Sequence, residues 1–313
     1  MQPTFDDSSW RKVDLPQDWA IEGPFKQEYD GATGRLKYWG PAWYRKHLTI
    51  PAADAGKQVY LDIDGSMSNA LVFCNGQCAG GWPYGYSSYR IDLTPFIHPG
   101  AENVIAIRLD TPENASRWYP GAGMYRNVWL VTTDKVHVAH WGTFVTTPKV
   151  SKDAATVNVQ VAIENDTDTA APVTVNTDIY TLDKNGHRGA LAAKLPAATW
   201  TVPPHFSSSK NGTTVTTTLP HPALWSIDSP NRYLAVTSVQ SDGQTVDTYE
   251  TPFGIRTVRF DPAAGVFING EHIHLNGVCD HHDLGAIGTA VNTRVLERQL
   301  QELKEMGCNA IRT

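Results

Sequence analysis

Short runs rich in β-branched and aromatic residues recur through the first 134 residues of the chain and are separated by turn residues. Runs of this length and composition are typical of strands. Their regular succession predicts a β-sandwich of the jelly-roll type for residues 1–134. The six runs are AWYRKHLTI (42–50), QVYLDIDG (58–65), NALVFCNG (69–76), YRIDLTPFI (89–97), NVIAIRLD (103–110) and RNVWLVTT (126–133).

Most of the tryptophans and tyrosines also lie before residue 142. Sugar-binding proteins place such aromatic faces against the C–H faces of sugars, but Trp and Tyr also bury large areas in the core of any sandwich. Composition therefore leaves both a sugar-binding and a purely structural role open.

Residues 135–252 are also rich in strand signals, but Thr, Val, Ala and Pro dominate and charge is sparse. We expect an immunoglobulin-like sandwich from about 118 residues of short strands, without the Cys–Trp–Cys core of antibody domains. The clearest runs are ATVNVQVAIEN (155–165), APVTVNTDIYTLD (171–183), TTVTTTL (213–219) and RYLAVTSVQSDG (232–243).

The hydrophobic period changes after residue 253. VFINGEHIHLNGV (266–278) predicts a hairpin turning at Asn-Gly and then a buried strand, whereas NTRVLERQLQELKEMG (292–307) predicts a helix with Asn292 as N-cap. CNAIRT then begins another strand, so strand, helix and strand form a βαβ unit with a parallel pair. We assign 253–313 to the first part of a truncated (β/α)₈ barrel.

The helix in this unit has Leu296, Leu300 and Leu303 on one face. Without further barrel elements this face has nothing to pack against, and exposed apolar patches mark interaction or aggregation sites. We therefore expect the C-terminal segment to pack on another copy or on the second sandwich, or to be poorly ordered.

Charge and hydropathy exclude two classes of protein. The chain has 26 Lys+Arg against 32 Asp+Glu and a net charge of −6, which argues against nucleic-acid binding. No window approaches the roughly 20 apolar residues of a membrane span. The start, MQPTFDDSSW, lacks the features of a signal peptide and is interpreted as an internal segment of a longer protein. Localisation stays unknown, with a bacterial periplasmic or secreted location left open.

The four cysteines are expected to be free thiols. Cys74 and Cys78 flank an Asn-Gly turn, so Cys74 faces Gln77 rather than Cys78. On neighbouring parallel strands Cys279 and Cys308 lie roughly 13 Å apart at about 3.3 Å per residue, beyond the reach of a disulfide. Their spacing predicts no zinc site.

The stretch LNGVCDHHDLGAIG (275–288) concentrates polar residues beside the first barrel strand. A metal site is one interpretation, but alternation along a strand gives only two ligands per side. A hydrogen-bonded polar loop is another. The third uses position: His281 and His282 follow the first strand and Arg312 ends the second, and in a (β/α)₈ barrel those ends form the active-site face.

The residues of this stretch and its continuation to Thr313 resemble the opening of the catalytic barrel of glycoside hydrolase family 2, closest to the β-galactosidase branch. Three further stretches resemble the family in the same order: FDDSSWRKVDLPQDWAIEG (5–23), GAGMYRNVWL (121–130) and LWSIDSPNRYLAV (224–236). The resemblance implies a jelly-roll sugar-binding domain, an immunoglobulin-like sandwich and a barrel.

The resemblance also implies a function and site residues. The parent protein is expected to be a retaining glycosidase hydrolysing terminal β-galactosides, with β-glucuronides or β-mannosides as alternatives. His281 is expected to contact the non-reducing sugar and Arg312 to hold the surroundings of the nucleophile. Asn127 occupies a sandwich position that reaches the sugar pocket, where the best-known galactosidases have Asp, and Trp118 lies in a loop beside it. No cofactor is expected in this chain, and Mg²⁺ or Na⁺ stays open for the full-length family.

One feature of the family is missing from these 313 residues. The acid/base Glu of the family follows an Asn, and the chain contains no Asn-Glu dipeptide. The chain is therefore expected to lack both catalytic glutamates and to be inactive alone. The alternatives are a weak carbohydrate-binding module or a structural platform, with a homo-oligomer formed through the sandwiches or the exposed barrel segment.

Overall fold

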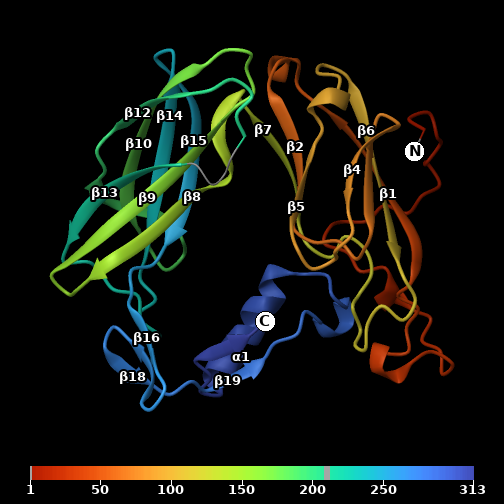
Figure 1. Cartoon of the computed structure of the whole chain (residues 1–313). Coiled ribbons are helices and arrows are strands. Elements are labelled where there is room, and N and C mark those ends of the chain that lie inside the picture. The colour runs from red at the N-terminus through yellow and green to blue at the C-terminus, as the bar shows by residue number, and fades with distance from the viewer. Residues whose placement is uncertain (1, 208–211) are drawn as a thin grey trace. The chain divides into compact units, whose positions relative to one another are not determined.

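The computed structural model describes residues 2–207 and 212–313, and the chain is mainly β, as the sequence predicted. Its residues form two compact units, one comprising residues up to Thr132 together with Gly277–Thr313 and the other Thr133–Asn276. The strands and the helix can be followed along the chain in Figure 1. Among the described residues, no helix is both long and apolar enough to cross a bilayer.

The first unit contains two antiparallel sheets around a shared apolar core. One sheet has the order β1 (Gly40–Thr49), β6 (Glu102–Thr111), β3 (Ala70–Cys74), β4 (Gln77–Trp82), and the other β5 (Tyr89–Asp92), β2 (Gln58–Ile63), β7 (Val128–Thr133). Buried side chains of β2, β3, β5 and β6 form this core, together with residues of adjoining loops. Fully buried examples are Val59, Ile63, Val72, Leu93, Leu109 and Met124.

Two features of this unit can be compared with the sequence in detail. The Asn75-Gly76 turn has φ values of 51° and 84°, and Cys74 pairs with Gln77, as predicted. The predicted strand at 89–97 is wrong in length, because it ends at Asp92. The Asp92 carboxylate accepts a hydrogen bond from the Thr94 amide, and a 3-10 helix follows over Thr94–Phe96.

The second unit is also built of two antiparallel sheets around one core. One sheet contains β8 (Val136–Val150), β9 (Ala154–Asn165) and β13 (Thr213–Pro220), and the other β10 (Ala171–Leu182), β11 (Arg188–Lys194), β12 (Ala198–Val202), β14 (Arg232–Ser241) and β15 (Gln244–Phe253). A three-stranded meander follows, with β16 (Val258–Asp261), β17 (Gly265–Ile268) and β18 (Glu271–Ile273). The turn between β17 and β18 is the predicted Asn269-Gly270.

The C-terminal segment contains β19 (Gly277–Cys279), α1 (Thr293–Glu305) and β20 (Ala310–Arg312). β19 and β20 pair in parallel with Cys279 opposite Arg312, which confirms the predicted βαβ unit. The Asn292 side chain accepts hydrogen bonds from the Arg294 and Val295 amides, so it is the N-cap of α1. All four cysteines are free. The expectation of a buried strand is wrong, because Gly277 and Cys279 are exposed in this two-stranded sheet.

The packing of this segment corrects one expectation. Residues 277–313 group with the first sandwich, a partner that was not among the expected ones. The Val291 amide donates to the Tyr125 carbonyl, and the buried Thr289 bonds to Asp18. The segment is thus held by specific hydrogen bonds from its connecting loop, even though the Leu300 side chain of α1 is exposed.

The grouping of residues also differs from the predicted domain limits 1–134, 135–252 and 253–313. Residues 253–276 group with the second sandwich and 277–313 with the first. Residues 253–276 group with the second sandwich because β15 continues to Phe253 and the β16–β18 meander follows it directly.

Candidate functional site

A cavity of about 620 Å³ lies within the first unit, where the C-terminal segment meets the sandwich. Three of the predicted substrate-binding residues, Trp118, His281 and Arg312, line it. The remaining lining residues are Tyr86, Tyr125, Arg126, Cys279, Asp280, His282, Leu284, Val291, Leu296 and Thr313. Residues from a sandwich loop and from the carboxyl ends of two parallel strands therefore share one cavity.

The fourth predicted residue, Asn127, does not line this cavity. It is exposed, and its carbonyl oxygen accepts a hydrogen bond from the Asp64 amide. The preceding Tyr125 and Arg126 line the cavity instead. The motif GAGMYRNVWL thus does contribute to the cavity, but through the residues just before the one singled out in the sequence.

The two histidines of the loop differ in their surroundings. His281 is exposed at the cavity, whereas His282 is half-buried against the sandwich. The Nε2 atom of His282 lies 3.2 Å from the Pro120 carbonyl oxygen, and its ring makes an edge contact with Tyr86 at 5.5 Å between centroids. His282 therefore anchors the loop, which leaves His281 available to a ligand.

The strand ends are tied together at the same place. The Asp280 amide donates to the carbonyl oxygen of Arg312 at 2.9 Å, which extends the β19–β20 pairing by one bond. This bond fixes the start of the histidine loop relative to Arg312. The carboxyl ends of β19 and β20 are therefore both held at the cavity.

A buried carboxylate fastens the loop at its far end. Asp18 is only 3 % exposed. One of its oxygens accepts hydrogen bonds from the Ala20 and Ala122 amides, and the other from the Tyr119 hydroxyl and from the amide and hydroxyl of Thr289. Burial, with the Asp18 charge added, raises the pKa of Tyr119 well above its usual range, so its hydroxyl stays a donor.

Two glycines permit this close packing. Gly121 has φ +72°, and a Cβ there would lie 1.9 Å from Thr289 Oγ1. Gly288 has φ +62°, and a Cβ there would lie 2.3 Å from Asp18 Oδ2. Positive φ values favour glycine, and in this case any side chain would also push the loop off the sandwich.

The aromatic wall of the cavity is hydrogen-bonded. Trp118 Nε1 donates to Tyr86 Oη at 3.0 Å, and Tyr125 Oη donates to the Gly85 carbonyl oxygen at 2.9 Å. Burial raises the pKa of Tyr86 and raises that of Tyr125 to about 12, so both phenols stay protonated at neutral pH. The wall therefore offers neutral aromatic faces with polar edges.

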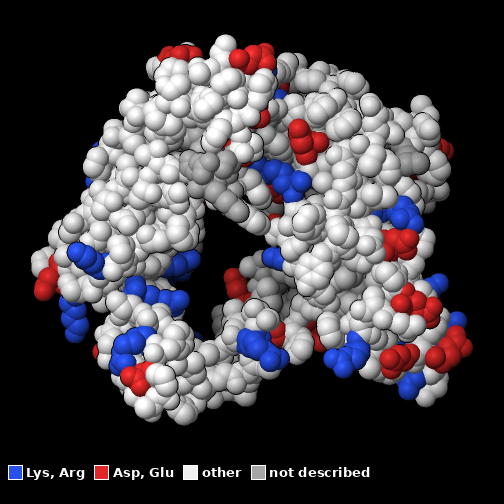
Figure 2. Space-filling model, in the orientation of Figure 1, with Lys and Arg blue, Asp and Glu red and all other residues white. Residues whose placement is uncertain are grey.

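The charges around the cavity are mixed. Arg126 and Arg312 are basic and Asp280 is acidic. Acidic and basic side chains are also interspersed on the face drawn in Figure 2. Within residues 2–207 and 212–313, no group of three or more His, Cys, Asp or Glu is placed to hold a metal ion. The cavity is suited to a ligand with many hydroxyl groups and an apolar face.

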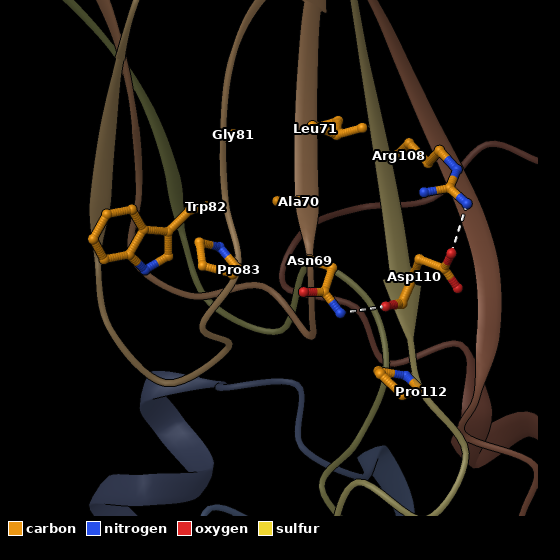
Figure 3. A pocket seen from close by; sticks show the side chains of 9 residues that line it. All are labelled: Asn69, Ala70, Leu71, Gly81, Trp82, Pro83, Arg108, Asp110 and Pro112. Atoms are coloured by element: carbon orange, nitrogen blue, oxygen red, sulfur yellow. Dashed lines mark hydrogen bonds and ion pairs between the residues drawn. The ribbon is translucent and has the colours of Figure 1, made fainter.

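A second pocket, of about 630 Å³, lies on the sheet that contains β3, β4 and β6 (Figure 3). Arg108 and Asp110 form an ion pair there with an N–O distance of 2.6 Å, and Asn69 Nδ2 donates to the Asp110 carbonyl oxygen. The charged groups of this pocket are already paired with one another, and none of the predicted site residues lies in it. The cavity at His281 is therefore the better candidate.

Several proteins that are similar to this chain are glycosidases. Residues 136–256 match the family model of glycosyl hydrolases family 2. A β-galactosidase of Bacteroides ovatus is 44 % identical over 99 % of this chain and 36 % of its own length, and a β-glucuronidase of Formosa agariphila is 30 % identical over 87 % and 29 %. The crystal structure of a β-glycosidase from Bacteroides vulgatus superposes with a TM-score of 0.88 at 34 % identity, covering 100 % of this chain and 38 % of that one.

The chain spans about a third of the length of the curated relatives it matches. Its likeness to them nevertheless extends over almost all of its own residues, including the C-terminal segment with β19, α1 and β20. The chain therefore belongs to glycosyl hydrolases family 2 and corresponds to the N-terminal portion of its β-galactosidase-like members.

Proposed function

We propose that this chain is the N-terminal part of a retaining glycosidase that hydrolyses terminal β-galactosides, and that His281, Arg312 and Trp118 form part of its sugar site. The observation that supports this most directly is the shared cavity, which joins a sandwich loop to the carboxyl ends of two parallel strands. The similarity to a β-galactosidase supports the choice of sugar.

In this proposal each residue has a physical role. The Trp118 ring packs against a C–H face of the sugar, and His281 hydrogen-bonds to its hydroxyls. Arg312 lies at a strand end, where its charge keeps a nearby carboxylate ionised, since an opposite charge within about 4–6 Å favours the charged form. Asn127, which does not line the cavity, is not given a role.

The proposed reaction needs two carboxyl groups, and Trp118, His281 and Arg312 supply neither. A retaining glycosidase uses an acid/base and a nucleophile about 5–5.5 Å apart. The chain contains no Asn-Glu dipeptide, in which the family's acid/base is found. We therefore propose that the 313 residues alone do not hydrolyse glycosides.

Hydrolysis of a nitrophenyl β-galactoside tests this proposal. We expect no turnover by the pure chain above that of a mock purification. Turnover that copurifies with the chain would contradict the proposed inactivity. Calorimetry with galactose then tests the site, and we expect weak binding that Trp118→Ala abolishes. Absence of any sugar binding would instead favour a structural platform.

A β-glucuronide is the second candidate substrate. Two guanidinium groups, from Arg126 and Arg312, line the cavity against one carboxylate, from Asp280. Such an excess suits a sugar carboxylate, which arginine binds through two parallel hydrogen bonds. Calorimetry with glucuronic acid and galactose at equal concentrations decides between them. Stronger binding of glucuronic acid that is lost in Arg126→Gln would favour the β-glucuronide.

A further inference from the structure

Aromatic side chains continue from the candidate sugar site onto the surface of the first unit. The loop between β4 and β5 contains Tyr84 and Tyr86, and Trp118 comes from the loop that follows β6. Tyr86 and Trp118 line the cavity, whereas Tyr84 lies outside it. Tyr84 is 58 % exposed and Trp118 47 % exposed, so both offer a large area to a ligand.

Ring contacts connect these residues without a gap. The centroid of the Tyr86 ring lies 5.5 Å from that of His282 and 5.6 Å from that of Tyr84. Trp118 is attached to the same residue through its hydrogen bond to Tyr86 Oη. The surface formed by Tyr84, Tyr86 and Trp118, which we call the aromatic platform, is therefore continuous with the cavity.

The loop that carries Tyr84 and Tyr86 is held by several contacts. The Gly85 carbonyl oxygen accepts a hydrogen bond from Tyr125 Oη, and Trp82 Nε1 donates to Ser87 Oγ at 2.9 Å. A Cβ at Gly85 would lie 2.4 Å from Met67 Sδ, so the backbone is packed directly against its neighbour. A surface fixed in this way loses little conformational entropy when it binds a ligand.

The neighbouring pocket is a separate feature. Figure 3 shows the Trp82 ring and the Arg108 side chain pointing away from each other. The strand register agrees, because Trp82 pairs with Ala70 and Arg108 with the next residue, Leu71. Tyr84, Tyr86 and Trp118 do not line the pocket at Arg108.

We propose that the aromatic platform binds further sugar units of the substrate, so that the preferred ligand is a β-linked oligosaccharide longer than a disaccharide. Tyr and Trp combine an apolar ring with a polar edge, and sugar rings combine C–H faces with hydroxyl edges. Rigid Tyr and Trp side chains also supply a large contact area at low entropic cost. This inference rests on the proposed function, since it starts from the sugar site at His281.

Calorimetry of the full 313-residue chain with galactose, lactose and a linear β-1,4-galactotetraose tests the inference. We expect the affinity to rise with the length of the sugar. In Tyr84→Ala, we expect binding of the tetraose to weaken about fivefold to tenfold relative to galactose, as for the loss of one well-packed aromatic contact. Tyr84→Phe keeps the ring and should retain most of the gain with length.

Phe144→Ala is the matched control, because Phe144 is also an exposed aromatic residue, at 64 %, but belongs to the second unit. We expect it to leave the affinities for all three sugars unchanged. Circular dichroism of each variant verifies that the sandwiches are folded.

The possible outcomes separate the inference from the proposed function. Equal affinity for all three sugars, or an equal loss for all three in Tyr84→Ala, would overturn the inference and leave the sugar site in place. Failure to bind any of the sugars at millimolar concentration would overturn both. A gain with length that depends on the Tyr84 ring would support the inference.

Discussion

At the scale of single residues, the Asp18 carboxylate of the first unit accepts five hydrogen bonds. Its hydrogen bonds join the N-terminal segment, the loop after β6 and the C-terminal segment. In Asp18→Asn, an NH₂ group would replace one carboxylate oxygen of Asp18. This NH₂ group would then face N–H or O–H donors that now bond to that oxygen. We expect the free energy of unfolding to fall by about 1–3 kcal/mol, the usual cost of leaving buried polar groups unsatisfied.

Amide hydrogen exchange shows which residues lose protection in Asp18→Asn. The Thr289 amide should exchange faster in Asp18→Asn, because its acceptor is Asp18 Oδ2. Asp14→Asn is the control, since Asp14 is exposed in the same N-terminal segment. Equal protection of Thr289 in both variants would show that Asp18 does not hold the loop.

Alanine substitution at two glycines distinguishes the stability cost of backbone strain from that of a steric clash. Gly121 and Gly56 have φ values of +72° and +85°, but a Cβ at Gly56 meets no atom within 4 Å, whereas one at Gly121 meets Thr289. Gly56→Ala should cost about 1 kcal/mol, from the left-handed conformation alone. Gly121→Ala should cost more and should also expose residues 277–313 to limited proteolysis. Similar losses and similar cleavage in both variants would contradict this explanation.

His47 gives the first unit a pH-dependent contact. Its hydrogen bonds with Asp7 and Glu102, at 3.1 Å and 3.2 Å, raise its pKa above the ordinary value of 6.5. A raised pKa in the folded state means that the contact stabilises fully below about pH 6.5 and is lost as pH rises through the folded pKa. The exchange protection around Asp7 should therefore decrease as pH rises above about 6.5. In His47→Gln this decrease should vanish, and its persistence would assign the pH dependence to another group.

At the scale of elements, the N-cap of α1 is the most local contribution to the C-terminal segment. Asn292→Ala removes the acceptor of the Arg294 and Val295 amides. We expect the first turn of the helix to lose about 1 kcal/mol of stability, as for other N-caps. Faster exchange of these two amides is the measurement. Thr293→Ala, at the exposed next position, is the control, and the same effect in that variant would argue against capping.

The elements that could be predicted are those with a complete local signal. The helix with its cap and the two Asn-Gly hairpins are examples. β11 and β12 were not predicted. RGALAAK contains no β-branched or aromatic residue, and ATWTV is a run of only five residues. Both segments pair with β10 in the structure. Asn127 shows the same limit at the site, because the chain bends at Arg126, and Tyr125 and Arg126 line the cavity whereas Asn127 does not.

At the scale of the whole molecule, the resemblance to a known family identified the fold class and three of the residues that share the cavity. It could not reveal that Tyr86 joins them, because Tyr86 lies in a turn-rich stretch with no pattern of its own. It also could not reveal which surface receives the C-terminal segment. The bonds from Thr289 to Asp18 connect positions 271 residues apart, and no short-range pattern encodes such a contact.

That separation has a consequence for how the protein is made. A chain leaves the ribosome from its N-terminus, and domains fold as units during synthesis. The residues of the sandwich that contain Asp18, Tyr119 and Ala122 are synthesised long before Thr289. The Asp18 carboxylate therefore lacks its hydrogen bonds from Thr289 until the whole second unit has been translated. Chaperones that shield nascent chains therefore meet a first unit whose final buried contacts are formed last.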